Sequence, residues 1–163
     1  MKSIKYIALS AFLTLSAFCA VLYSSCTKDE CKDVTCQNGG VCSGGNCTCV
    51  VGYEGTRCET KSRDKFVGTY VGSELCTIGT DNYSITISAN SDNVKLTYTN
   101  LYNNTPVITA VCTMTGTDAF SFSGTQSTIT FSGTGKLVGN QLTVDYTITD
   151  GTSTNTCKFT GNK

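Results

Sequence analysis

The sequence predicts a mainly β protein in two parts, a small disulfide-rich module followed by an antiparallel all-β meander. Six cysteines fall within residues 31–58, a density typical of exported miniature domains in which disulfides replace a core. Over most of residues 65–163 apolar and polar residues alternate, which is the period of half-buried strands. Turn-forming pairs such as Gly139-Asn140 and Asp150-Gly151 separate the alternating segments.

The N-terminal segment, residues 1–25, has the pattern of a signal peptide. Lys2 and Lys5 precede an apolar stretch over residues 7–22 that serine and threonine interrupt. A transmembrane helix needs about 20 mostly apolar residues, so we predict a cleaved signal and export of the chain.

The end of this segment, Leu22-Tyr23-Ser24-Ser25-Cys26, resembles a bacterial lipobox. The resemblance implies that Cys26 is acylated and anchors the mature chain to a membrane; ordinary cleavage that leaves a spare thiol is the alternative. Lys28-Asp29-Glu30 resembles the export signal of Bacteroidota surface lipoproteins, which implies the outer leaflet of the outer membrane. We therefore expect residues 26–30 to be a lipidated tether, with a plain charged tether as the alternative to the export signal.

The six-cysteine run admits fifteen pairings, and geometry removes only a direct bond between Cys47 and Cys49, which share a strand face. The run Cys47-Thr48-Cys49, with Gly52-Tyr53, Gly55 and Cys58 after it, resembles the EGF-like signature. The family's pattern implies Cys31–Cys42, Cys36–Cys47 and Cys49–Cys58 for residues 31–58. Four glycines suit its turns: Gly39, Gly40, Gly52 and Gly55.

Metal binding by this module is not expected. Asp29-Glu30 resembles the acidic pair of calcium-binding EGF-like modules, but the four residues between Cys42 and Cys47 are too few to carry the further ligand. Zinc is disfavoured because the chain is exported and contains no histidine.

The polar, charged residues 59–64 are predicted to be a linker, and residues 65–163 an all-β domain. About eight strands fit either a small closed barrel or a two-sheet sandwich. The inward-facing residues are expected to be Tyr83, Ile85, Ile87, Ala89, Val94, Leu96, Tyr98, Ile108, Ala110, Cys112, Met114, Phe120, Phe122, Ile129, Phe131, Leu142, Val144, Tyr146, Ile148, Cys157 and Phe159.

The opening Phe66-Val67-Gly68-Thr69-Tyr70 resembles the first strand of lipocalin-like barrels, with Tyr70 at the usual tryptophan position. This resemblance favours the barrel. In a closed meander the first and last strands are neighbours, so we predict a Cys76–Cys157 disulfide. Cys112 is then a free, buried thiol.

An enzyme is not predicted. The chain has no histidine or tryptophan, which removes Ser-His-acid and Cys-His sites, and no phosphate-binding glycine loop. Only Glu74 and Asp145 among the carboxylates of the β domain lie within strand patterns, where exposed strand faces explain them better than a glycosidase pair does. The others are expected at turns: Asp64, Asp81, Asp92, Asp118 and Asp150.

Twelve basic and twelve acidic residues give no attraction for nucleic acid, and no cofactor is expected. We predict a surface-anchored lipoprotein with a binding, adhesion or structural role, its EGF-like module being a rigid spacer or contact surface. Its partner would be a protein, a glycan or a small apolar ligand. The alternative is a carrier of a small apolar ligand lined by some of Phe66, Tyr70, Tyr98, Phe120, Phe122, Phe131, Tyr146 and Phe159.

Overall fold

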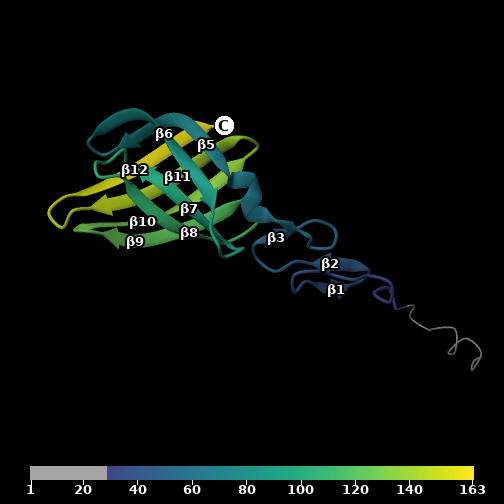
Figure 1. The fold of residues 1–163 in the computed structure, drawn as a ribbon. Coiled ribbons are helices and arrows are strands. Elements are labelled where there is room, and N and C mark those ends of the chain that lie inside the picture. Colours follow the sequence, from purple (N-terminus) through teal and green to yellow (C-terminus); the bar gives the residue numbers. More distant parts are fainter. Residues whose placement is uncertain (1–28) are drawn as a thin grey trace, which may run out of the picture.

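The computed structural model describes residues 29–163 as two parts that follow one another along the molecule (Figure 1). The predicted signal peptide, the lipidation site Cys26 and residues 27 and 28 of the tether lie outside the described residues. A small disulfide-rich region comes first and a β-barrel second. Within residues 29–163, none of the helical structure has the length and hydrophobicity needed to span a membrane.

The disulfide-rich region holds two small antiparallel sheets. In the first, β1 (Val41–Ser43) pairs with β2 (Asn46–Thr48). Gly44 and Gly45 form the two-residue turn between them with φ values of 55° and 76°, a conformation that favours glycine. In the second, β3 (Tyr53–Glu54) pairs with β4 (Thr60–Lys61).

Three disulfides hold this region together. They join the pairs that the EGF-like resemblance implied, Cys31–Cys42, Cys36–Cys47 and Cys49–Cys58. Each closes a loop of about ten residues, which restricts the unfolded chain and stabilises a unit too small for its own core.

The second part is a closed barrel of eight antiparallel strands in the order β10-β11-β12-β5-β6-β7-β8-β9. The mainly β fold class is therefore confirmed, and the all-β domain is a closed barrel and not a two-sheet sandwich. The strands are β5 (Gly68–Cys76), β6 (Gly79–Ala89), β7 (Lys95–Leu101), β8 (Ile108–Met114), β9 (Ala119–Gln126), β10 (Ile129–Val138), β11 (Gln141–Thr149) and β12 (Thr154–Asn162).

Pairing of the first and last barrel strands closes the sheet. β5 and β12 run antiparallel with Cys76 opposite Cys157, and a disulfide joins these two residues. At the other end of the same strand pair, a Cβ on Gly72 would lie 2.2 Å from the Thr160 carbonyl oxygen. The close approach of the two strands therefore depends on a glycine.

The barrel interior is filled by side chains. All eight aromatic residues predicted to line it are buried, and rings such as Tyr98 and Phe122 pack edge to face with centroids 5.9 Å apart. On β10, Gly135 leaves the space that the Phe120 ring occupies. Most predicted inward residues are buried; Ala89 is exposed, and Val94 and Ile129 are half-buried.

The segment predicted as a linker is ordered and joins the two parts. It contains β4 and continues into η1 (Ser62–Phe66), a short 3₁₀ helix. Arg63 in η1 is only 7% exposed. Its Nη1 donates to the carbonyl oxygens of Asn90 at 2.5 Å and Lys95 at 3.3 Å, and also to that of Asp92. A charged residue that composition assigns to solvent is thus buried because it meets carbonyls of the β6–β7 loop.

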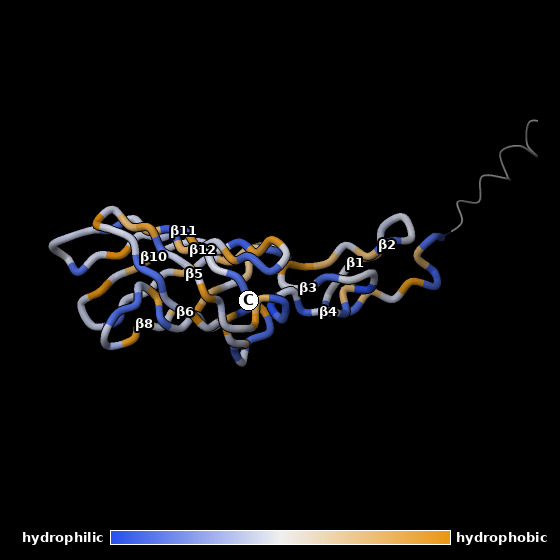
Figure 2. Tube along the Cα trace, turned by 90° about the horizontal axis from the view of Figure 1, so that it is seen from above, coloured by the Kyte–Doolittle hydropathy of each residue, from blue (hydrophilic) through white to orange (hydrophobic). Residues whose placement is uncertain are grey.

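A second contact crosses the same junction. Lys65 forms ion pairs of 2.7 Å with Glu54 of the disulfide-rich region and with Asp118 of the barrel. A Cβ on Gly52 would lie 2.5 Å from Val94 Cγ1, so the small region packs directly on the β6–β7 loop. Figure 2 shows the resulting elongated arrangement, with the disulfide-rich region extending from one end of the barrel.

Candidate ligand site at the distal mouth of the barrel

The two ends of the barrel differ. At the end next to the disulfide-rich region, η1 covers the interior: Phe66 is fully buried, and its ring meets Phe120 with centroids 5.5 Å apart. β5 starts there, directly after η1, so Cys76 at its end lies at the opposite end. We call that opposite end the distal mouth. Its rim consists of the loops β5–β6, β7–β8, β9–β10 and β11–β12.

Three cavities open at the distal mouth. One, of about 250 Å³, lies between the β7–β8 and β9–β10 loops and is lined by Asn104, Thr105, Pro106, Ile108, Gln126, Ser127, Thr128 and Ile129. The other two both include Tyr102.

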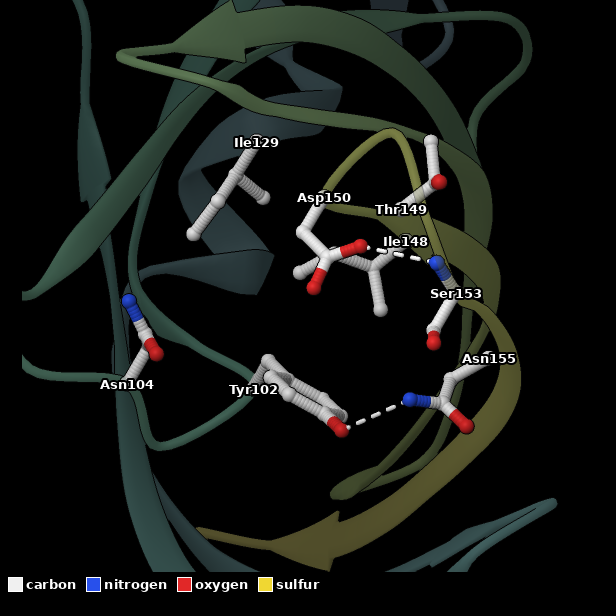
Figure 3. A pocket seen from close by; sticks show the side chains of 8 residues that line it. All are labelled: Tyr102, Asn104, Ile129, Ile148, Thr149, Asp150, Ser153 and Asn155. Atoms are coloured by element: carbon white, nitrogen blue, oxygen red, sulfur yellow. Dashed lines mark hydrogen bonds between the residues drawn. The ribbon is translucent and has the colours of Figure 1, made fainter.

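The larger of the two cavities that include Tyr102, of about 290 Å³, is lined by Glu74, Cys76, Ile78, Gly79, Thr80, Asp81 and Tyr102. The smaller, of about 150 Å³, is lined by Tyr102, Asn104, Ile129, Ile148, Thr149, Asp150, Ser153 and Asn155, and Figure 3 shows these side chains around the opening. None of the three linings contains a lysine or an arginine. Carboxylates are therefore the charged groups that a ligand at this end meets.

Tyr102 contributes to two of the three cavities. It follows a β-bulge at the end of β7 and has a φ of 62°, a left-handed conformation that is costly for a non-glycine residue. The Asn155 side-chain amide on β12 donates to its hydroxyl at 2.9 Å, and Figure 3 shows the ring reaching across the opening toward Asn155. An unusual backbone geometry thus places an aromatic ring over the mouth.

Glu74 is the buried charge of the site. It lies on β5 and is 3% exposed, whereas the sequence analysis placed it on an exposed strand face; that prediction is wrong. Tyr83 on β6 donates its hydroxyl to Glu74 Oε1 at 2.7 Å, and Tyr146 on β11 donates to the same oxygen at 2.5 Å. These two hydrogen bonds make the burial of a carboxylate tolerable.

A signal for this position was present in the sequence. On β5 the residues in phase with buried Tyr70 are Gly72, Glu74 and Cys76, so period-two alternation assigns Glu74 to the inner face. Asp81, predicted at a turn, also lies in a strand, opposite Glu74 on β6. Residues directly opposite in an antiparallel pair share a face, which explains why both carboxylates line the larger cavity.

Burial dominates the electrostatics of this cluster. It raises the pKa of Glu74, with a further upward contribution from Asp81, while the hydrogen bonds from Tyr146 and Tyr83 act in the opposite direction. Burial also raises the pKa of Tyr98 well above its usual value, with further upward contributions from the nearby Tyr83 and Glu74. The Tyr98 hydroxyl is buried and has no hydrogen-bond partner among the described residues.

The second carboxylate oxygen of Glu74, Oε2, differs from Oε1 in its contacts. Within residues 29–163 no hydrogen bond or ion pair involves Oε2, although the side chain lines the larger cavity. Asp81 is more fully occupied: its Oδ1 accepts from the Asn82 backbone N–H at 2.8 Å, and its Oδ2 accepts from the Asn103 amide at 2.8 Å. Glu74 Oε2 is therefore the available acceptor of the cavity.

The other candidate residues do not assemble an active site. Asp145 is exposed on β11, and its Oδ1 lies 3.5 Å from Lys158 Nζ. Its side chain therefore faces away from the barrel interior, where Glu74 lies. Cys112 is the free cysteine of the described residues and is buried, as predicted. Burial raises its pKa to about 12, so the thiol stays protonated and is a poor nucleophile.

One group of donor atoms among residues 29–163 has the spacing of metal ligands. One donor atom from each of Glu74, Cys76 and Cys157 lies within 4.8 Å of the others. The two sulfurs are bonded to one another, however, and a disulfide does not supply the thiolates that a metal takes. This group is therefore not a metal centre, and two of its members, Glu74 and Cys76, line the larger cavity.

Comparison with known proteins gives little further guidance. No protein-family model matches the chain, and no curated protein matches it. A solved structure from Bacteroides fragilis, described as a "putative outer membrane protein", matches with a TM-score of 0.43 and 17% sequence identity. The match covers 63% of this chain and 52% of that one, so it spans about half of the neighbour's length. At this similarity it supports no conclusion about fold or activity.

Proposed function

We propose that the protein is a lipid-anchored binding protein of the cell surface, in which the distal mouth of the barrel is the binding end. The observation that carries the proposal is the difference between the two barrel ends. One end is covered by η1 and the disulfide-rich region, whereas the other holds three open cavities. Binding sites in small barrels commonly lie at the mouth.

The order of the parts along the chain supports this orientation. An anchor at Cys26 would precede the disulfide-rich region, which precedes η1 and the proximal end of the barrel. Because the disulfide-rich region extends from one end of the barrel (Figure 2), the distal mouth at the other end would then point away from the membrane.

The junction supports a spacer role for the EGF-like region. Three disulfides fix the region internally. Arg63 and Lys65 then tie it to the barrel through the β6–β7 loop and Asp118. A buried guanidinium that meets several carbonyls resists bending more than a flexible linker does, because bending would leave polar groups unpaired.

The alternative function, a carrier that encloses a small apolar molecule, receives less support. The eight aromatic side chains that would line such a ligand fill the interior themselves, as barrels of this size allow. Two of the cavities at the mouth are bordered by Glu74, Asp81 and Asp150, which suits a polar ligand better than an apolar one.

The proposal is tested by fragment mapping on the folded, oxidised chain. Cationic, anionic and neutral fragments are added to isotopically labelled protein, and backbone amide shifts are followed by NMR. We expect at least one class to shift amides of the β5–β6, β7–β8 and β11–β12 loops. Shifts confined to the disulfide-rich region or the outer barrel face would overturn the assignment of the mouth.

The anchor needs a separate measurement. Mass spectrometry of the N-terminal peptide from native membranes should find a diacylglyceryl group on Cys26, and a protease added to intact cells should release the barrel. An unmodified Cys26 thiol, or full protection from the protease, would contradict surface anchoring.

A further inference from the structure

We propose that the larger cavity of the distal mouth binds the ammonium group of a small organic amine, with Glu74 Oε2 as the anionic anchor. This inference rests on the proposed function, since it names the ligand class of the same mouth. The proposal rests on Glu74, a carboxylate that is almost completely buried and borders an open cavity, and whose Oε2 has no partner among residues 29–163.

The charge of Glu74 is not compensated by any described residue. Both of its hydrogen bonds come from neutral tyrosine hydroxyls, and both end on Oε1. None of the ion pairs among residues 29–163 includes Glu74. An unpaired buried carboxylate is costly, so a cation that enters the cavity gains a partner whose desolvation has already taken place during folding.

The tyrosines also prepare the anchor. Tyr83 and Tyr146 approach Oε1 from β6 and β11, so two rigid strands fix the carboxylate. A side chain held in this way loses little conformational freedom when it binds. Oε2 is left as the acceptor for a charge-assisted N–H···O hydrogen bond, which is stronger than a neutral one.

The remaining lining selects an organic ammonium ion over other charged ligands. Asp81 adds a second negative charge, while Ile78, the disulfide sulfur of Cys76 and the Tyr102 ring supply apolar contact for a short stem. Anions would be repelled by the two carboxylates. Hard metal ions take six or more oxygen ligands, more than this lining offers with Asp81 already engaged by Asn103.

The size of the cavity limits the ligand. Its volume of about 290 Å³ is at the lower end of the range for small-molecule sites. It therefore fits a small amine, or the terminal ammonium group of a longer molecule whose remainder stays outside the mouth.

The test is a titration with n-butylammonium chloride, with 1-butanol as the neutral probe of similar shape and sodium butyrate as the anionic one. We expect saturable binding of the amine, seen as amide shifts at Thr80, Asp81 and Tyr102, and binding at least about tenfold weaker for 1-butanol. Glu74→Gln should weaken amine binding by about tenfold or more. Asp145→Asn, which removes an exposed carboxylate of the outer face, should leave it unchanged.

Two further measurements distinguish a loss of amine binding from misfolding of the Glu74→Gln variant. Asp81→Asn should weaken amine binding by a smaller factor than Glu74→Gln, with the wild-type fold verified by its amide spectrum. In the unmodified protein, amine binding should weaken as the pH falls and Glu74 becomes protonated. The titratable groups around Glu74 are Tyr83 and Asp81 on β6, Tyr98 on β7 and Tyr146 on β11.

The outcomes separate this inference from the proposed function. Equal affinity for n-butylammonium and 1-butanol, or an unchanged affinity in a folded Glu74→Gln variant, would overturn the amine inference while a neutral or anionic fragment at the mouth would leave the binding end intact. If no fragment of any charge reached the mouth, both would fail.

Discussion

The hydroxyl of Tyr146 lies 2.5 Å from Glu74 Oε1, although the two residues are 72 positions apart in the chain. Tyr146 lies on β11 and Glu74 on β5, and β12 runs between these strands. The hydrogen bond therefore crosses the inside of the barrel and connects strands that do not pair. Such a contact stabilises the closed barrel as a whole.

Removal of this hydrogen bond should destabilise the fold. Tyr146→Phe leaves the ring but takes away a donor to a buried carboxylate, so we expect the free energy of unfolding to fall by about 1.5–3 kcal/mol. Urea denaturation measures this loss of unfolding free energy. Tyr98→Phe is the matched control, because the buried Tyr98 hydroxyl has no hydrogen-bond partner in the described part of the chain and its loss should be neutral or stabilising. Equal losses for the two variants would contradict this account of Glu74.

Glu74 should make the stability of the barrel depend on pH. Its pKa is raised in the folded state. Between the unfolded and the folded pKa of Glu74, the folded chain therefore binds more protons than the unfolded chain. The contribution of Glu74 to the free energy of unfolding is therefore fully present below its unfolded pKa and is lost as the pH rises through its folded pKa. The difference in unfolding free energy between wild type and Glu74→Gln, measured from pH 4 upward as a function of pH, should show this decline. A flat difference would refute it.

Arg63 should be essential to the junction. Arg63→Met removes a 7% exposed guanidinium and leaves carbonyls of the β6–β7 loop without their donor, for which we expect a loss of about 1–3 kcal/mol in unfolding free energy. Chemical denaturation and hydrogen exchange of residues 90–95 report the loss. Lys158→Met, which breaks an exposed pair with Asp145, should cost at most about 1 kcal/mol. A similar small loss for Arg63 would show that the segment is a linker after all.

The Cys76–Cys157 disulfide should contribute strongly to stability. It closes a loop with a sequence separation of 81, which corresponds to about 4 kcal/mol on the chain-entropy model. The double variant Cys76→Ser/Cys157→Ser should lower the unfolding free energy by about that amount without changing the barrel topology. Thermal and urea unfolding measure the effect, with Cys112→Ser as the control for a change at a cysteine outside any disulfide. A loss no larger than that of the control would contradict the role of the closure.

Much of this architecture follows from local patterns in the sequence. Cysteine spacing identifies residues 31–58 as a disulfide-rich unit, and alternation predicts a meander in which Cys76 and Cys157 become neighbours. Gly139-Asn140 marks the β10–β11 turn correctly. Patterns of this kind act over a few residues, so their signal survives without knowledge of the tertiary fold.

The candidate site was harder to predict because its residues come from distant strands. Charge assigns Glu74 and Arg63 to solvent, although alternation on β5 places Glu74 on the inner face. The partners that make their burial possible come from distant segments: two tyrosines for Glu74 and three carbonyls for Arg63. The position of Tyr102 depends on a bulge at Asn100 with a φ of 71°. No local pattern indicates that the next residues turn back over the mouth.

The disulfide at the rim makes the finished structure of the site depend on the redox state of its surroundings. Cys76 lines the larger cavity next to Glu74, and its bond to Cys157 joins β5 to β12 at the rim. In a reducing cytosol the same positions would carry two separate thiols, and this covalent link would be absent. If the chain is exported as we propose, the rim would become covalently closed only in the oxidising compartment, so that completion of the site would be coupled to export.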